Sequence, residues 1–126
     1  MSEILVLVVD DYVDSREMCA EYLTLCGFRV EQASSGAEAL EKAAGIGPDV
    51  VLMDLSLPDI DGLEVTRRLK AESATANIAI IALTGHAMGE HAEKARAAGC
   101  VSFLVKPCPP DDMVAEIKRV LGAEKP

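Results

Sequence analysis

The 126-residue sequence has little aromatic and little basic character. It contains no tryptophan, two tyrosines and two phenylalanines, so a hydrophobic core built from it must be mainly aliphatic. Its 12 Lys and Arg stand against 21 Asp and Glu, a formal net charge of -9. Sequence-independent binding to DNA or RNA needs clustered Lys and Arg, and so does docking on an anionic membrane. We therefore expect neither a nucleic-acid nor a membrane partner, whereas cationic partners such as metal ions suit this charge.

Long hydrophobic runs and cysteine motifs are also missing. No apolar run approaches the ~18–20 residues of a membrane span, and residues 1–4 give no basic lead-in to a secretory signal. The four cysteines, which are Cys19, Cys26, Cys100 and Cys108, form no C-x-x-C pair. Reduced thiols in a cytoplasmic protein are the interpretation we favour over a metal or redox role.

Short aliphatic runs recur along the chain and predict five strands. They cover residues 4–9, 28–31, 50–53, 78–83 and 101–105. The first, third and fourth runs are continuous, which is typical of strands buried on both faces. Residues 28–31 alternate between apolar and polar, so we expect this strand at an edge of the sheet.

Helix signals separate these runs. Three capping boxes precede the first three helices, at Asp14 with Glu17, Ser35 with Glu38 and Asp61 with Glu64. The first predicted helix places Met18, Tyr22, Leu25 and Cys26 on one face and stops at Gly27. The second ends near Gly45, the fourth runs from about 87 to 98, and the fifth covers 110–122. The alternation predicts an α/β fold, a doubly wound parallel sheet with five strands and five helices, in one domain spanning 1–126 with an ordered core of about 4–121.

Chemically distinctive side chains stand where the predicted strands end. Asp10 and Asp11 follow the first strand, Asp54 ends the third, Thr84 follows the fourth and Lys106 the fifth. Ligands of open α/β sheets bind at the carboxyl ends of the strands, so we expect these five residues to converge at one rim.

The residue types at this rim favour phosphoryl chemistry with a hard metal ion. Three carboxylates near one point repel each other unless a cation joins them, and oxygen ligands without His or Cys select Mg²⁺, or Mn²⁺, over zinc. Lys106 suits a phosphoryl oxygen, and Thr84 can donate a hydrogen bond to another. One carboxylate can then attack phosphorus and form an acyl phosphate, while the metal and Lys106 stabilise the transferring group.

Motifs spread over the whole chain carry a family resemblance. They are Asp10-Asp11, the stretch Asp54-Leu55-Ser56-Leu57-Pro58-Asp59-Ile60-Asp61-Gly62, Thr84-Gly85, Phe103 and Lys106-Pro107. With these motifs the chain resembles the response-regulator receiver domain of two-component signalling, from residue 4 to about 121. The resemblance implies a flavodoxin-like fold with strand order 2-1-3-4-5.

The resemblance also implies roles for the rim residues. Asp54 would be the phosphoacceptor. Mg²⁺ would be ligated by Asp11, by Asp54 and by the backbone carbonyl of Ser56, with Asp10 acting through water. Lys106 would pair with Asp54 and then with the phosphoryl group.

Further positions would carry the switch. Thr84 would move toward the phosphoryl oxygens, and Phe103 would turn inward in the active state. Ser56 and His86 would tune the lifetime of the phosphoryl group. The Lys106–Pro107 peptide bond would be cis, an isomer that is essentially confined to proline.

The function predicted from these residues is a phosphorelay receiver rather than an enzyme with substrate turnover. A histidine kinase or histidine phosphotransfer protein would phosphorylate Asp54, and the surface of the fourth helix, fifth strand and fifth helix would then change its downstream partner. Met1 and the short tail favour a stand-alone chain, whereas residues 10–18 resemble receivers of hybrid kinases, so a fragment of a hybrid kinase or larger regulator stays open.

Two other classes fit the sequence less well. A Mg²⁺-dependent phosphatase with an aspartyl-phosphate intermediate would need a D-x-D motif, but the chain has Asp54-Leu55-Ser56. A flavin-binding electron carrier of the same fold would need a loop rich in glycine and hydroxyl groups after the first strand. Asp10 and Asp11 stand there instead and would repel a phosphate.

Overall fold

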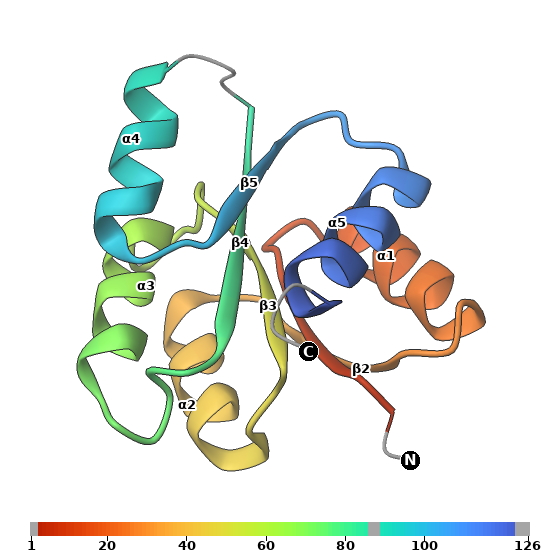
Figure 1. Ribbon diagram of the computed structural model, residues 1–126, viewed down its shortest axis with the longest axis horizontal. Helices are drawn as coiled ribbons and strands as arrows, with labels where there is room; N and C mark the ends of the chain where they lie inside the picture. Colours follow the sequence, from red (N-terminus) through yellow and green to blue (C-terminus); the bar gives the residue numbers. More distant parts are fainter. Residues whose placement is uncertain (1–2, 86–88, 123–126) are drawn as a thin grey trace.

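The computed structural model describes residues 3–85 and 89–122 and shows a parallel sheet between two layers of helices (Figure 1). The strands are β1 (Leu5–Val9), β2 (Arg29–Ala33), β3 (Val50–Asp54), β4 (Ala79–Thr84) and β5 (Ser102–Val105). The helices are α1 (Val13–Leu25), α2 (Gly36–Ile46), α3 (Gly62–Ala71), α4 (Gly89–Ala98) and α5 (Pro110–Gly122). All neighbouring strands are parallel, in the order β2-β1-β3-β4-β5, so the predicted fold and strand order are confirmed.

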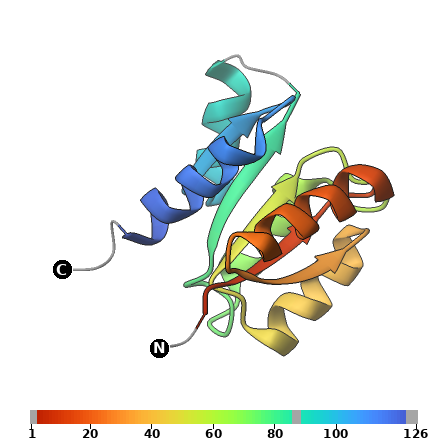
Figure 2. The same cartoon turned by 90° about the vertical axis from the view of Figure 1, so that its right-hand side faces the viewer.

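The continuous aliphatic runs are explained by helices on both faces of the sheet. Residues alternate along each strand, so Leu7 and Val9 pack toward α2, α3 and α4, whereas Val6 and Val8 pack toward α1 and α5. Figure 2 shows α1 and α5 together in front of the sheet. The residues of β1, β3 and β4 are all buried. These strands therefore hold the residues at their carboxyl ends in fixed positions.

The first helix differs from its prediction in its start and in its inner face. The helix begins at Val13, and no side chain caps it, so the capping box predicted at Asp14 is wrong. Asp10 makes the preceding turn instead, because its Oδ1 accepts a hydrogen bond from the Tyr12 N–H at 3.0 Å. Leu23 faces the core, whereas Leu25, on the predicted apolar face, is 81% exposed. Packing against β1 and β2, which local spacing does not report, selects the inner face.

The other two predicted capping boxes form only in part. Ser35 caps α2 as predicted, with its Oγ accepting from the Glu38 N–H at 3.1 Å, but the Glu38 carboxylate accepts from the Ser34 N–H at 2.7 Å instead of from Ser35. Asp61 caps α3 through the Leu63 N–H at 2.7 Å. The Glu64 carboxylate does not complete that box, because it pairs with Arg67 and Arg68 instead.

The remaining element boundaries shift by one or two residues. β2 extends to Ala33, and α2 ends at Ile46, followed by Gly47 with a left-handed φ of 61°. The predicted start of the fourth helix and His86 lie outside the described residues, as does the tail 123–126. Among the helices that the structure describes, none combines the length and apolarity needed to cross a membrane.

Candidate phosphoryl-acceptor site

The carboxyl ends of four neighbouring strands bring the predicted site residues to one edge of the sheet. Asp54 and Thr84 are the last residues of β3 and β4, while Asp10 and Lys106 come directly after β1 and β5. Backbone bonds extend the ladder to this edge: the Leu55 N–H donates to the Leu83 carbonyl at 3.1 Å and the Lys106 N–H to the Thr84 carbonyl at 2.7 Å. The side chains are therefore held by the rigid centre of the fold.

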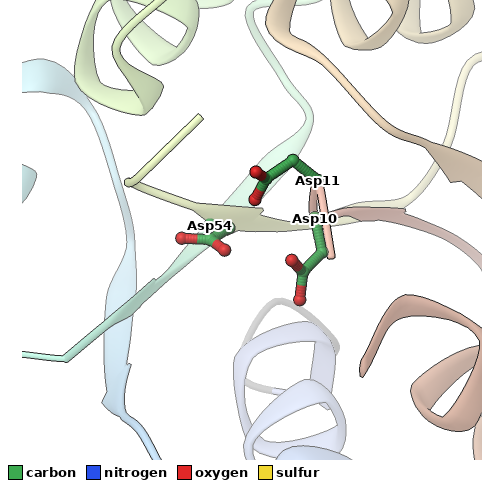
Figure 3. A group of neighbouring side chains, drawn as sticks. All are labelled: Asp10, Asp11 and Asp54. Carbon is green, nitrogen blue, oxygen red and sulfur yellow. The ribbon is translucent and has the colours of Figure 1, made fainter. Parts of the chain in front are cut away.

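Three carboxylates form the centre of this edge. Figure 3 shows Asp10 and Asp11 after β1, beside Asp54 at the end of β3. Each offers an oxygen, and these oxygens lie within 4.8 Å of one another. Asp10 and Asp54 are each only 5% exposed, whereas Asp11 is open to solvent. Such a set of hard oxygen donors with one solvent-facing side fits Mg²⁺ or Mn²⁺, which keep several water ligands, and the repulsion among the acids favours such a cation.

The Asp54 carboxylate is oriented by one contact on each oxygen. Its Oδ1 accepts a hydrogen bond from the Ser56 N–H at 2.9 Å, and its Oδ2 accepts one from Lys106 Nζ at 2.8 Å. The same Nζ lies 3.8 Å from Asp10 Oδ2. Lys106 thus neutralises part of the acidic cluster and lies in direct contact with Asp54, the residue predicted to be the phosphoacceptor.

Burial and charge set the protonation of Asp10 and Lys106. Burial is the main cause that raises the pKa of Asp10, and the Asp54 charge adds to it, while the Tyr12 N–H and Lys106 oppose the rise. For Lys106, burial is the largest single influence and lowers the pKa. The hydrogen bond and charge of Asp54, with the charges of Asp10 and Asp11, outweigh it and leave the pKa raised. Lys106 is therefore a permanent cation at neutral pH.

The structure also places the residues predicted to switch. Thr84 is buried, with 6% exposure, at the end of β4. Phe103 lies in β5 opposite Ala82, half-buried against the core cluster on the α2, α3 and α4 side. The peptide bond between Lys106 and Pro107 is cis. His86, predicted to tune the phosphoryl lifetime, lies outside the described residues.

The cysteines, predicted to be reduced thiols, form no disulfide in the structure. All four cysteines are free. Cys19 and Cys108 line a largely apolar cavity of about 410 Å³ between α1 and α5, which reaches Asp10 and Lys106. Burial raises the pKa of the Cys19 thiol to about 11 and also raises that of Cys108. These thiols are protonated at neutral pH, which disfavours a nucleophilic role.

Sequence reasoning missed the contribution of Gly62, the first residue of α3. A Cβ at this position would lie 2.6 Å from the Asp54 carbonyl oxygen and 2.8 Å from the Leu55 Cα. Both neighbours are backbone atoms, so the start of α3 approaches the end of β3 as closely as it does only because residue 62 has no side chain. A glycine directly after the Asp61 cap was the available signal.

We expect Gly62→Ala to disturb Asp54 as well as the fold. The new methyl group must push α3 away from the Asp54 backbone, and such overpacking costs roughly 1–3 kcal/mol of unfolding free energy. Chemical denaturation measures this loss. Gly45→Ala is the matched control, because a Cβ at residue 45 meets nothing within 4 Å and Ala in a helix is favoured over Gly by about 0.5–1 kcal/mol. Equal stability of Gly62→Ala and wild type would contradict the close approach.

Comparison with known proteins agrees with this geometry. The family model described as "Response regulator receiver domain" matches residues 6–118. The polar-differentiation response regulators DivK of Brucella ovis and Brucella abortus are 34% identical over 117 residues, which is 93% of this chain and 95% of theirs.

Solved structures give the same result. The chemotaxis protein CheY4 of Vibrio cholerae superposes with a TM-score of 0.90 and 32% identity, covering 94% of this chain and 99% of that one. The receiver domain of a sensor histidine kinase from Pseudomonas aeruginosa PAO1, with a magnesium ion coordinated in its active-site cleft, has a TM-score of 0.88 and 29% identity, covering 96% of this chain and 99% of that one. The matching family model, the relatives at 34% identity and the shared fold together show that this chain belongs to the response-regulator receiver domain family.

Proposed function

We propose that this receiver is a phosphorylation switch whose acceptor is Asp54. The observation that carries the proposal is the setting of the Asp54 carboxylate, which is bound by Lys106 Nζ at 2.8 Å and lies among carboxylate oxygens within 4.8 Å of one another. The donor is a phosphohistidine on a histidine kinase or a histidine phosphotransfer protein. Family membership supports this donor class.

Asp10, Asp11, Asp54 and the backbone carbonyl of Ser56 are the groups that would hold Mg²⁺, or Mn²⁺, at this edge. When bound, the ion supplies positive charge that offsets the carboxylates and the phosphoryl oxygens. The donor set is all oxygen and partly exposed, which supports this assignment. Asp11 is exposed, so solvent reaches it more easily than it reaches the buried Asp10 and Asp54.

Phosphoryl transfer follows from the position of Asp54. A carboxylate oxygen of Asp54 attacks phosphorus, the new O–P bond forms as the P–N bond of the phosphohistidine breaks, and the imidazole leaves and takes up a proton. Lys106 keeps its proton and exchanges the Asp54 oxygen for a phosphoryl oxygen, where its charge stabilises the transferring group.

The added group then biases the switch. It brings a charge of about -1.5 to -2 and strong acceptor oxygens to a partly buried edge. Thr84, at the end of β4, donates a hydrogen bond to it, and Phe103 on the adjacent β5 turns inward. The surface of α4, β5 and α5 changes its downstream partner, as a shift between two populated states. Ser56 and His86 set how long the phosphoryl group persists.

The chain acts in this proposal as a signalling module, not as an enzyme that turns over substrate, with residues 4–121 as one receiver domain. Ser56 stands where an aspartyl-phosphate phosphatase would have its second acid. The relatives include both a response regulator and the receiver of a histidine kinase, so the proposal covers a stand-alone regulator and a domain of a larger one. A cytoplasmic location without nucleic-acid or membrane partners stays a prediction from the sequence.

Metal removal tests this function. We expect acetyl phosphate with Mg²⁺ to add one phosphoryl group to the protein, and an excess of EDTA to reduce the uptake to background, because the carboxylates then repel the donor. Intact mass spectrometry measures the adduct, and Mn²⁺ should restore it after EDTA is removed. No adduct with Mg²⁺, or equal adduct in EDTA, would contradict the proposal.

A further inference from the structure

The loop from Leu55 to Asp61, which follows β3, is tied to a helix far away in the sequence. The two oxygens of Asp59 accept hydrogen bonds from consecutive backbone N–H groups of α2, Oδ1 from Gly36 at 2.8 Å and Oδ2 from Ala37 at 3.0 Å. Neither bond is local, since 23 and 22 residues separate the partners. Asp59 therefore joins the loop beside Asp54 to the first turn of α2.

These bonds satisfy donors that a helix cannot satisfy internally. The first N–H groups of an α-helix have no partner within the helix, and the helix dipole favours a carboxylate beside them. Asp59 takes the N–H groups of Gly36 and Ala37, and the Ser35 hydroxyl takes that of Glu38. The two backbone bonds lower the pKa of Asp59, with Ala37 as the larger cause, so the carboxylate is ionised at neutral pH.

Close packing at both ends of the loop supports the same contact. A Cβ on Gly36 would lie 2.9 Å from Ile60 Cβ and from Val65 Cγ2, so α2 approaches the loop and α3 at a distance that only glycine permits. A hydrogen bond joins the two ends of the loop, because the Gly62 N–H donates to the Leu55 carbonyl at 3.3 Å, next to the Asp54 backbone. Ser56 lies between these fixed points.

We propose that Asp59 is a positioning residue, which holds the 55–61 loop on α2 and thereby keeps Ser56 in place beside Asp54, to whose Oδ1 the Ser56 N–H donates. This inference rests on the proposed metal site, in which the backbone carbonyl of Ser56 is a ligand. Asp59 acts through the backbone and touches neither the metal nor the phosphoryl group. Its loss should loosen the loop and weaken metal binding, because a ligand that moves must be ordered each time the ion binds.

Binding of Mn²⁺ alone, followed by electron paramagnetic resonance of the free ion, tests the inference. We expect Asp59→Ala to raise the dissociation constant about tenfold, the lower end of the range for groups that orient metal ligands, because Asp59 is exposed. Asp61→Ala is the matched control. It removes an equal charge from the same loop but breaks only a local bond to the Leu63 N–H, so its dissociation constant should stay within about twofold of wild type.

Two further variants separate positioning from helix stability. Ser35→Ala removes a cap of the same α2 terminus without touching the loop, and it should leave Mn²⁺ binding unchanged. Asp59→Asn keeps the shape and one acceptor oxygen, and we expect an intermediate effect in a protein whose circular dichroism equals that of wild type. These results would support a positioning role.

The inference is overturned when Asp59→Ala and Asp61→Ala weaken binding equally, since charge alone then explains the effect. It is overturned as well when Ser35→Ala weakens binding as much as Asp59→Ala, or when Asp59→Ala binds like wild type. In all three cases wild type still binds Mn²⁺ and still forms its adduct with acetyl phosphate. Failure of the proposed function looks different, because wild type itself then lacks both.

Discussion

Asp54→Asn will take up no phosphoryl group from acetyl phosphate and Mg²⁺, and it will fold like wild type. The amide of Asn is not a nucleophile toward phosphorus, whereas its carbonyl oxygen can still accept one of the two bonds that Asp54 accepts now, from Ser56 N–H and Lys106 Nζ. The substitution also removes one of three clustered negative charges, so the unfolding free energy in metal-free buffer should not fall.

Intact mass spectrometry measures the phosphoryl uptake, and thermal denaturation measures the stability. Asp61→Asn serves as the control, because it removes a negative charge from the loop after β3 but lies outside the carboxylate cluster. It should take up the phosphoryl group at a rate close to that of wild type. An adduct on Asp54→Asn as large as on wild type would assign the acceptor to another carboxylate.

Lys106→Met will slow phosphoryl transfer and destabilise the metal-free protein. Removing a preorganised cation or donor from a site of charge development costs roughly 10²–10³ in rate. The buried carboxylates of Asp54 and Asp10 would also lose their cation, at 2.8 and 3.8 Å. Breaking a fully buried pair costs about 3–5 kcal/mol. Because the Lys106 side chain is 36% exposed, solvent screens this pair and we expect about 2 kcal/mol.

Quenched time courses of phosphoryl transfer measure the loss of rate, and urea denaturation in EDTA measures the loss of unfolding free energy. Mg²⁺ should restore part of the stability because it supplies another cation. Arg67→Met is the matched control. Its ion pair with Glu64 is exposed, so the unfolding free energy should change by less than about 0.5 kcal/mol and the rate should not change. A Lys106→Met variant with wild-type rate and stability would remove Lys106 from the mechanism.

The sheet and the acidic site were predictable because their signals are local. Each buried strand appears as a run of aliphatic residues, and parallel strands place the residues that follow them at one edge. The sequence alone therefore predicts that Asp10, Asp54 and Lys106 lie together. Their contacts in the structure join three strand ends, as that reasoning requires.

Other features depend on contacts between distant segments and carry no comparable signal. The inner face of α1 is selected by packing on the sheet. The local pattern therefore placed Leu25 on the inner face, whereas this apolar residue is 81% exposed. Asp59 appears in the sequence as one more acid of a turn, and its bonds to α2 follow only from how α2 and α3 pack together. Gly62 is needed because of the neighbouring Asp54 backbone, which no local rule describes.

Among the three adjacent carboxylates, we propose that Asp54 accepts the phosphoryl group. Borohydride reduces an acyl phosphate to the alcohol and so converts a phosphorylated aspartate into homoserine, which peptide mass spectrometry locates. After incubation of the wild-type protein with acetyl phosphate and Mg²⁺, we expect homoserine at position 54 and unchanged aspartate at positions 10 and 11. Homoserine at position 10 or 11, with aspartate intact at 54, would contradict it.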